Sequence, residues 1–429
     1  ARGDLAHMEV ALAGYAPRPL HASLVLDGRD DPVWSVAARS EELDLGQLVP
    51  AQYLAQAPAP LALDFNARGR GGSARLQGRV RQGDQELVLA PSNIVIDNQV
   101  LTVSPLVAEA FGYWNTNAAF IWGPHENLCL NNILRNGSPE QVARWVPDLC
   151  AGRKVGALGL TEPGAGSDAL GSMALRAVRD GDDYILTGRK MFISNGPVAD
   201  LVLTYAKTDP ARGPKGISAF VVETDTPGFS VAQTLDKMGW RGCPTGELVF
   251  EGVRVPAANL LGAENAGVGI VMSGLDIERA FLGLPYIGAA QRCLDLALDH
   301  AATRQQFGQP IGRFQMIQAM LADMHTRIEA ARTYAYRALS ACDAMARGEG
   351  GRGQIHALTA SSCLFGADMM DFVADREVQI FGGSGFLRDM EVNLHYRNAR
   401  IASLGGGTNE VRRIIIAEEL FRARGLKLD

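Results

Sequence analysis

Several residue types and patterns are scarce in this sequence of 429 residues, and each scarcity excludes a class of protein. Cysteine occurs six times without any Cys-x-x-Cys pair, which argues against a disulfide framework and predicts reduced, buried thiols. The seven histidines lack the spacing of metal ligands, so we expect no metal site. No apolar run approaches the roughly 20 residues of a membrane-spanning helix, and no apolar stretch of a signal peptide follows the first residues.

The sequence also lacks a strong charge of either sign. Its net charge of -6 argues against nucleic acid or a membrane surface as the main partner. No Gly-x-Gly-x-x-Gly motif follows a predicted strand, which argues against a Rossmann domain. Hydrophobic residues make up 47% and charged residues 21%, proportions typical of a globular protein, and the length is enough for two or three domains.

The spacing of apolar residues divides the chain into four segments. Residues 1–105 are rich in Ala, Gly and Arg, and we expect a loop or linker over 62–85 and strand-like stretches over 86–103. Residues 106–155 show helical spacing, with a helix start at Ser138 and Pro139. Residues 156–262 predict strands of an antiparallel sheet or barrel, and residues 263–429 predict the long helices of a bundle. The predicted fold class is therefore α+β, with several domains.

One stretch combines turn residues with a strand. Residues 158–195 read LGLTEPGAGSDALGSMALRAVRDGDDYILTGRKMFISN, in which a Gly/Pro/Ser turn from Thr161 to Asp168 precedes an alternating strand that ends at Asn195. Turn residues leave backbone N–H groups that can point at an anion or a carbonyl. Composition alone favours an ordinary hairpin.

Three further stretches could carry chemistry. Residues 272–279 read MSGLDIER, and spacing alone favours a solvated or paired carboxylate at Glu278. Residues 404–410 read LGGGTNE and predict a helix start that suits an anion. Residues 304–308 (RQQFG) and 379–385 (QIFGGSG) combine an arginine fork with glycines that allow close backbone approach. An alternative interpretation is that Arg304 is simply a cation at the C-terminus of a helix, where the helix dipole favours positive charge.

The order of these motifs closely resembles the acyl-CoA dehydrogenase family, because TEPGAGSD is followed by GRKMFISNG. The match covers about residues 110–425. The resemblance implies an N-terminal mainly α domain, a middle antiparallel β-barrel or sandwich domain and a C-terminal four-helix bundle. On this reading residues 1–105 are an atypical region that matches the family poorly, 106–155 are the remainder of the α domain, 156–262 the β domain and 263–429 the bundle.

The resemblance implies a bound FAD. The Thr161–Asp168 turn would contact the flavin ring edge, with Phe192 beside the ring where the family usually has Trp, and Ser194 where it has Thr. Segments 304–315 and 379–385 of a neighbouring subunit would hold the diphosphate and adenosine. The residues expected to bind the cofactor are Leu158, Leu160, Thr161, Gly166, Ser167, Phe192, Ile193, Ser194, Arg304, Phe307, Gln315, Gln379, Ile380, Gly382, Gly383, Thr408, Asn409 and Glu410.

The resemblance also implies a catalytic base. MSGLDIER is close to the isovaleryl-CoA dehydrogenase branch, whose base stands at the position of Glu278, whereas most of the family carries its glutamate at the position of Gly406. The Gly405-Gly406 pair leaves room for a branched acyl group near the thioester. At a separate position, Leu394, this chain lacks the basic residue that the family usually has. The residues expected to bind substrate are Ser167, Asp276, Arg279, Gly405, Gly406 and Gly407.

The implied function is the FAD-dependent α,β-dehydrogenation of a short or branched-chain acyl-CoA to the enoyl-CoA, as in leucine catabolism. Electrons would pass to electron transfer flavoprotein, and the enzyme would be a homotetramer, cytoplasmic in a bacterium or in the mitochondrial matrix of a eukaryote. Two alternatives stay open. One is an acyl-CoA oxidase or flavin monooxygenase-like relative, and the other is a non-catalytic flavin or acyl-CoA-binding relative.

Overall fold

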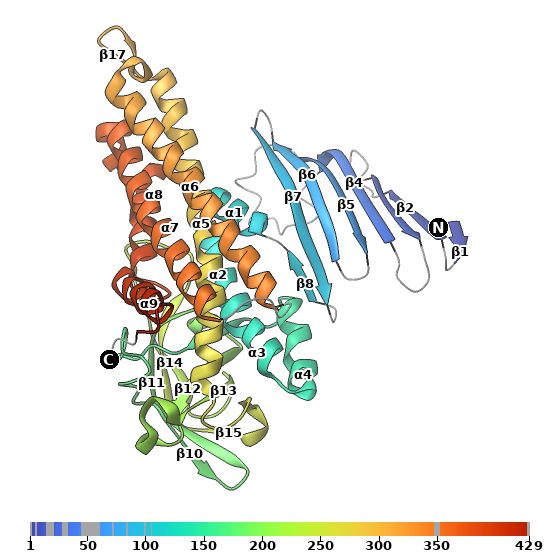
Figure 1. Cartoon of the computed structure of the whole chain (residues 1–429), viewed down its shortest axis with the longest axis vertical. Coiled ribbons are helices and arrows are strands. Elements are labelled where there is room, and N and C mark those ends of the chain that lie inside the picture. Colours follow the sequence, from blue (N-terminus) through green and yellow to red (C-terminus); the bar gives the residue numbers. More distant parts are fainter. Residues whose placement is uncertain are drawn as a thin grey trace. The chain divides into compact units, whose positions relative to one another are not determined.

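The computed structural model describes residues 2–4, 7–13, 21–27, 33–43, 61–70, 73–82, 85–97, 100–103, 105–346 and 352–426. They belong to two compact units, Ala1–Val107 and Ala108–Asp429 (Figure 1). Among the described residues, none of the helices combines the length and the apolar character that crossing a membrane requires.

The first unit contains an eight-stranded sheet in which each strand pairs antiparallel with the next along the chain. The strands are β1 (Arg2–Asp4), β2 (His7–Ala13), β3 (His21–Asp27), β4 (Val33–Leu43), β5 (Leu61–Arg70), β6 (Ser73–Gln82), β7 (Gln85–Asp97) and β8 (Val100–Val103). The strands predicted over 86–103 are confirmed. The loop predicted over 62–85 is wrong. In β5 and β6 the arginines and other polar residues alternate with apolar residues at the period of two that suits a strand, with Gly69 and Gly78 at apolar positions.

Short helices follow along the chain, and the first of them begins at the end of the first unit. They are α1 (Pro105–Trp114), α2 (Thr116–Gly123), the π-helix η3 (Pro124–Leu130), α3 (Asn131–Asn136) and α4 (Pro139–Cys150). The start predicted at Ser138 is confirmed by a capping box, in which the Ser138 hydroxyl accepts from the Gln141 N–H and the Gln141 side chain accepts from the Ser138 N–H.

A seven-stranded path follows, in the order β14-β15-β11-β10-β12-β13-β16. Its strands, with β9 at the side of β12, are β9 (Gly156–Gly159), β10 (Arg176–Asp180), β11 (Asp183–Ser194), β12 (Leu201–Lys207), β13 (Ile217–Glu223), β14 (Phe229–Thr234), β15 (Thr245–Pro256) and β16 (Leu260–Leu261). Most pairs are antiparallel as predicted, but β12 pairs parallel with β9 and β10. Buried aromatic and β-branched side chains such as Phe220, Val222 and Phe250 fill the interior of this part.

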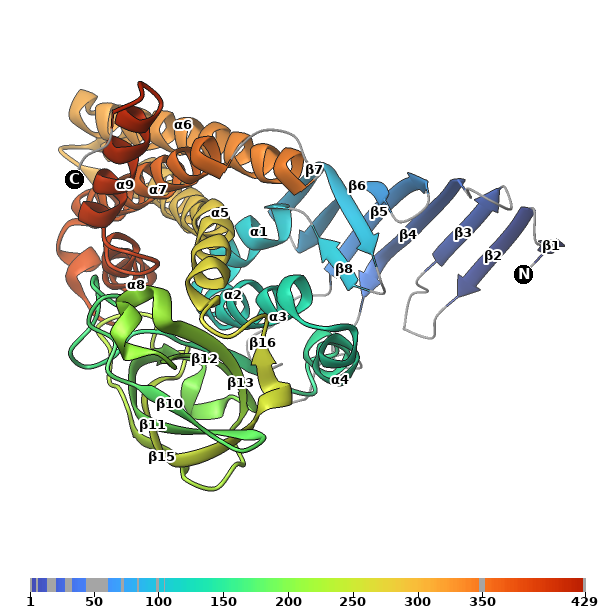
Figure 2. The same cartoon turned by 60° about the horizontal axis from the view of Figure 1, so that its bottom comes forward.

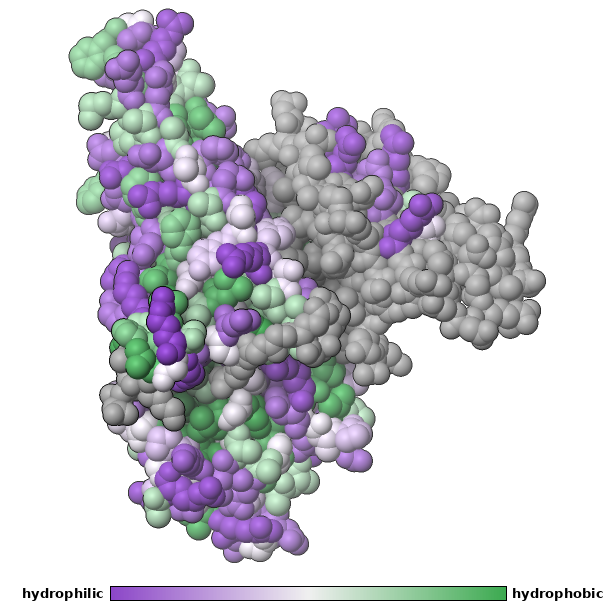
Figure 3. Space-filling view, in the orientation of Figure 1, coloured by the Kyte–Doolittle hydropathy of each residue, from purple (hydrophilic) through white to green (hydrophobic). Residues whose placement is uncertain are grey.

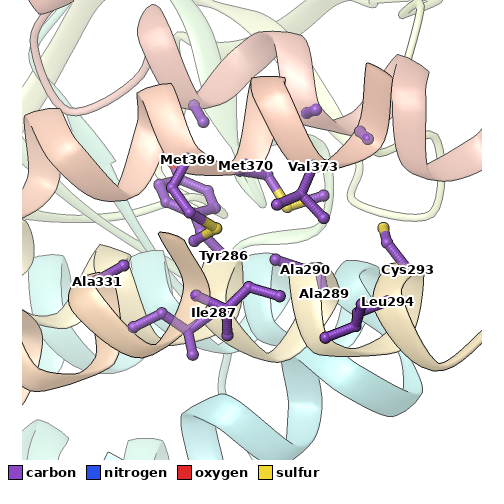
Figure 4. Packing of buried hydrophobic residues seen from close by; sticks show 14 of the residues in the cluster. Tyr286, Ile287, Ala289, Ala290, Cys293, Leu294, Ala331, Met369, Met370 and Val373 are labelled. Carbon is purple, nitrogen blue, oxygen red and sulfur yellow. The ribbon is translucent and has the colours of Figure 1, made fainter. Parts of the chain in front are cut away.

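Five α-helices, of which α5, α6 and α7 are long, complete the described part of the second unit (Figure 2). They are α5 (Gly267–Thr303), α6 (Gln315–Ala346), α7 (Arg352–Phe381), α8 (Glu391–Ala399) and α9 (Asn409–Arg422). Helix α5 packs against α6 and α7, and α9 packs against α7. Small side chains on α5, including Ala289 and Ala290, face Met370 and Val373 of α7 in the core (Figure 4). Hydrophilic residues are spread along the face of the bundle drawn in Figure 3, with smaller hydrophobic areas between them.

Candidate active site

Glu278 lies on α5 and is 8% exposed. Burial raises the pKa of its carboxyl to about 7, while the positive charges of Arg279 and Arg412 oppose the rise. Its carboxylate has no hydrogen bond or ion pair with any of the described residues. A carboxylate in this state is a competent base near neutral pH.

The loop of three glycines lies against the same stretch of α5. The Gly406 carbonyl accepts a hydrogen bond from Arg279 Nε at 3.3 Å. A Cβ added at Gly406 would lie 2.7 Å from Cδ1 of Leu282, one helical turn after Glu278. Gly406 (φ +67°) and Gly407 (φ +92°) both have positive φ, which favours glycine. Positions 278 and 406, which are far apart in the sequence, are therefore neighbours.

Arg412 on α9 also holds this loop, although no motif in the sequence points to it. Its side chain is fully buried. The guanidinium donates to the carbonyls of Ala402 at 2.8 Å and Gly405 at 2.5 Å, and to Asn409 Oδ1 at 2.6 Å. Its place in the helix that follows the three glycines could have suggested that it lies near the loop. An arginine in a helix is usually exposed, however, so a buried role was not expected.

Asp276 supplies a second buried carboxylate next to Glu278. One of its oxygens lies 3.4 Å from Arg279 Nη1 and 2.5 Å from His356 Nδ1. Two carboxylates thus accompany the two buried guanidinium groups of Arg279 and Arg412. Opposite charges reduce the cost of burying each group.

The predicted turn rests on a buried ion pair. Lys190 Nζ lies 2.9 Å from Glu162 Oε1 and donates to the carbonyl of Leu160. Glu162 also accepts from the N–H groups of Ala174 and Leu175. The N–H of Met191 donates to the Thr161 carbonyl at 2.8 Å. These bonds join the turn that begins at Thr161 to the strand β11, so residues 160–162 and 190–191 lie side by side.

The turn leaves several predicted cofactor residues accessible. Gly166 and Ser167 are exposed, and Leu158, Leu160 and Thr161 are half-buried. On the strand opposite, Phe192 is 63% exposed at φ +60°, Ile193 is buried and Ser194 is half-buried. Phe192 thus has an unusual backbone conformation for a non-glycine residue and an exposed aromatic ring. Such a ring could pack against a flat ligand.

The remaining cofactor residues are elsewhere in the chain. Arg304, Phe307 and Gln315 are exposed near the short hairpin of β17 (Gln305–Gln306) and β18 (Gln309–Pro310). Figure 1 shows this hairpin at the end of the bundle away from β10 and β15. A single chain therefore does not bring these residues to the turn.

The second predicted adenosine segment lies near the first. His300, shortly before Arg304, stacks on Phe381 with ring centroids 4.1 Å apart. Gln379, Gly382 and Gly383 around Phe381 are exposed, whereas the neighbouring Ile380 is buried. The two segments thus share one end of the bundle.

The last predicted group begins α9. Thr408 caps this helix by accepting from the Val411 N–H at 3.3 Å, which confirms the predicted helix start. Glu410 is exposed, but Asn409 is buried and donates to Asp368 at 2.8 Å. The Asn409 side chain is therefore engaged within the chain, and its role toward a cofactor stays a prediction. Leu394 is half-buried on α8.

Family models for acyl-CoA dehydrogenases match three consecutive parts of the chain: the N-terminal domain over 101–153, the middle domain over 157–253 and the C-terminal domain over 265–421. Mitochondrial isovaleryl-CoA dehydrogenase of Oryza sativa subsp. japonica is 44% identical over 301 residues, 70% of this chain and 72% of that protein. Mitochondrial 2-methylacyl-CoA dehydrogenase of Solanum tuberosum is 43% identical over 305 residues, 71% and 72% of the two chains. The structure of butyryl-CoA dehydrogenase from Megasphaera elsdenii has a TM-score of 0.70 at 38% identity, covering 74% of this chain and 81% of that one.

Proposed function

The chain belongs to the acyl-CoA dehydrogenase family, and we propose that it removes the α-proton and the β-hydride of a short or branched-chain acyl-CoA, giving the enoyl-CoA. Isovaleryl-CoA is the first candidate substrate, in keeping with the names of the relatives. The observation that carries the proposal is the placement of Glu278 beside the Gly405–Gly407 loop, with a carboxyl pKa raised to about 7 by burial.

Glu278 is the proposed catalytic base. The α-proton of a thioester is too weakly acidic for a carboxylate in water, so the site must both strengthen the base and stabilise the enolate. Burial strengthens the base, because it disfavours the charged carboxylate of Glu278 relative to the neutral acid and so raises its pKa. When Glu278 takes the proton, its carboxyl becomes neutral, and the charge that it loses appears on the thioester oxygen.

The N–H of Gly406 is the proposed donor to that oxygen. It makes no hydrogen bond within the described part of the chain. The same peptide group carries the Gly405 carbonyl, which accepts from Arg412. Since N–H and C=O point in opposite directions in a trans peptide, Arg412 holds the Gly406 N–H facing away from its own side chain. Arg412 is thus a positioning residue for the donor.

The exposed residues of the turn fit a flavin. Members of this family are flavoproteins, and FAD, when bound, supplies the acceptor for the β-hydride. Phe192 offers a free aromatic face, and the accessible backbone and hydroxyls around Thr161 and Ser167 offer hydrogen bonds to a ring edge. Arg304 and Phe307 would complete the site from a neighbouring subunit, which requires at least a dimer. We propose a homotetramer.

The space near the loop supports a branched acyl group. A Cβ at Gly405 would meet nothing closer than 3.5 Å, so this position leaves volume that a larger residue would occupy. We further propose electron transfer flavoprotein as the electron acceptor and leucine catabolism as the metabolic context. The proposed location is the mitochondrial matrix in a eukaryote, in keeping with the mitochondrial relatives, or the cytoplasm in a bacterium.

The proposal is tested by adding a panel of acyl-CoA thioesters to the purified flavoprotein without oxygen and following the loss of flavin absorbance. We expect isovaleryl-CoA to reduce the flavin. We expect Glu278→Gln to keep its FAD and lose turnover by about 10²–10⁴-fold, because an amide cannot accept the proton.

Two outcomes would contradict the proposed function. Near-normal turnover of Glu278→Gln would remove Glu278 from the mechanism. Stoichiometric peroxide formation in air, with no rate gain from electron transfer flavoprotein, would identify an oxidase instead.

A further inference from the structure

Three potential metal ligands meet inside the bundle, away from the groups that the proposed reaction uses. They are Cys293 on α5, Glu377 on α7 and His395 on α8. Cys293 and Glu377 are fully buried and His395 is 5% exposed. One ligand atom from each lies within 4.8 Å of the other two. Figure 4 shows Cys293 on α5 beside the packed core.

A second carboxylate supports the imidazole. His395 Nδ1 lies 3.0 and 3.1 Å from the two oxygens of Glu377, while its Nε2 lies 3.5 Å from Glu391 Oε1. Arg292 holds Glu391 in place with bonds of 2.9 and 3.0 Å to its two oxygens. Metal-binding histidines commonly have one nitrogen toward the metal and the other toward a carboxylate that orients the ring.

We propose that Cys293, Glu377 and His395 bind a divalent transition metal ion, with Zn²⁺ as the ion that fits best. Thiolate, imidazole and carboxylate together are a donor set that zinc accepts, whereas Mg²⁺ and Ca²⁺ prefer oxygen ligands. Zinc–ligand bonds of about 2.0–2.3 Å place neighbouring ligand atoms roughly 3–4 Å apart. Water can fill a fourth position.

The charges of this set also suit a dry interior. A zinc ion with one thiolate, one carboxylate and a neutral imidazole has no net charge, so the buried site avoids the cost of an uncompensated ion. A thiol must lose its proton to bind a metal ion, so binding at this site would release a proton.

The ion would join three helices. Glu377 stands two residues before Gln379, in the segment expected to contact the adenosine of a neighbouring subunit's cofactor. A metal at this point would fix the end of α7 against α5 and α8. The role is structural, and it does not depend on the proposed dehydrogenation.

The experiment measures metal in the full-length flavoprotein. The protein is expressed with added zinc, passed through gel filtration in EDTA, and analysed for metal by mass spectrometry and for zinc ligands by X-ray absorption. We expect close to one zinc per chain and a single sulfur neighbour at about 2.3 Å. We expect Cys293→Ser and His395→Gln to lower zinc affinity by at least about 100-fold, and Cys129→Ser, at an equally buried cysteine of η3, to leave it unchanged.

Several results would overturn the site. The first is that the wild type contains no zinc, either as purified or after anaerobic reconstitution with Zn²⁺. The second is that zinc binds without a sulfur neighbour, and the third is that Cys293→Ser keeps its full zinc content. If the variants do not fold, the absorption spectrum of the wild type alone still decides the question.

Discussion

Replacing each glycine of the 405–407 loop with alanine would test how this loop excludes a side chain. A Cβ at Gly406 would meet Leu282 Cδ1 at 2.7 Å, and the residue has φ +67°. A Cβ at Gly407 (φ +92°) would meet nothing closer than Arg279 Nη2 at 3.6 Å. At Gly405 the nearest atom would be 3.5 Å away, and φ is not in the left-handed region. The three positions therefore separate backbone strain from steric overlap.

The magnitudes follow from these differences. Left-handed backbone costs a residue with a Cβ about 1–2 kcal/mol, and overpacking a closed site costs about 1–3 kcal/mol. We expect Gly406→Ala to lower the free energy of unfolding by about 2–3 kcal/mol, because the overlapped Leu282 methyl ends a flexible side chain and keeps the overpacking cost near its lower limit. We expect Gly407→Ala to lower it by about 1–2 kcal/mol. Gly405→Ala should be neutral, or stabilising by about 0.4–1 kcal/mol through the unfolded chain.

Denaturant unfolding of the three holoproteins, followed by circular dichroism, gives the comparison. Leu282→Ala in the Gly406→Ala background supplies a further control, because it removes the overlapping methyl groups. We expect the double variant to be less destabilised than the sum of the single variants.

Equal losses of stability in Gly405→Ala and Gly406→Ala, or strict additivity of Leu282→Ala and Gly406→Ala, would contradict the steric conflict at Gly406. In that event the loop would tolerate a side chain at 406. The proposed location of the base on α5 would then need an explanation other than lack of space on the loop.

Three more predictions concern the base, the turn and the cofactor. The rate constant kcat/KM should rise with pH through about 7, because Glu278 must be deprotonated to act and burial raises its pKa to about 7; a pH–rate profile measures this. Glu162→Gln should cost about 3–5 kcal/mol of unfolding free energy at pH 7, because it leaves the Lys190 ammonium buried without its carboxylate; denaturant unfolding measures this. Arg304→Ala should weaken FAD binding about tenfold or more without changing stability, because the exposed guanidinium would pair with the diphosphate; flavin fluorescence titration measures this.

Each of these has a matched control. The acid limb should disappear in Glu278→Gln, and an unchanged limb would assign it to another group. Glu162→Gln combined with Lys190→Met should cost less than Glu162→Gln alone, and an equal cost would deny the ion pair its role. Arg313→Ala changes another exposed arginine close to the same hairpin, and equal FAD loss in both variants would indicate a general charge effect.

Much of the fold was predictable because it depends on local patterns. Apolar spacing of 3.6 residues predicted long helices over 263–429, where α5, α6, α7 and α9 lie. Alternation predicted strands over 156–262, where β11, β12 and β15 lie. Where Gly and Arg masked the alternation, in β5 and β6, the prediction failed. The family resemblance, which rests on the order of the motifs, also drew attention to Glu278 and the three glycines, and their catalytic roles stay predictions.

Tertiary structure decided everything that depends on distance between remote residues. Arg412 joined the glycine loop only when α9 packed next to it. Its two Nη atoms donate to the backbone carbonyls of Ala402 and Gly405, contacts that no pattern of side chains in the sequence predicts. Cys293, Glu377 and His395 are 84 and 18 residues apart along the chain, spacings that suggest no ligand set. Short-range order is encoded in neighbouring residues, but the pKa of Glu278 and the grouping of buried ligands arise from burial and packing, which require the whole fold.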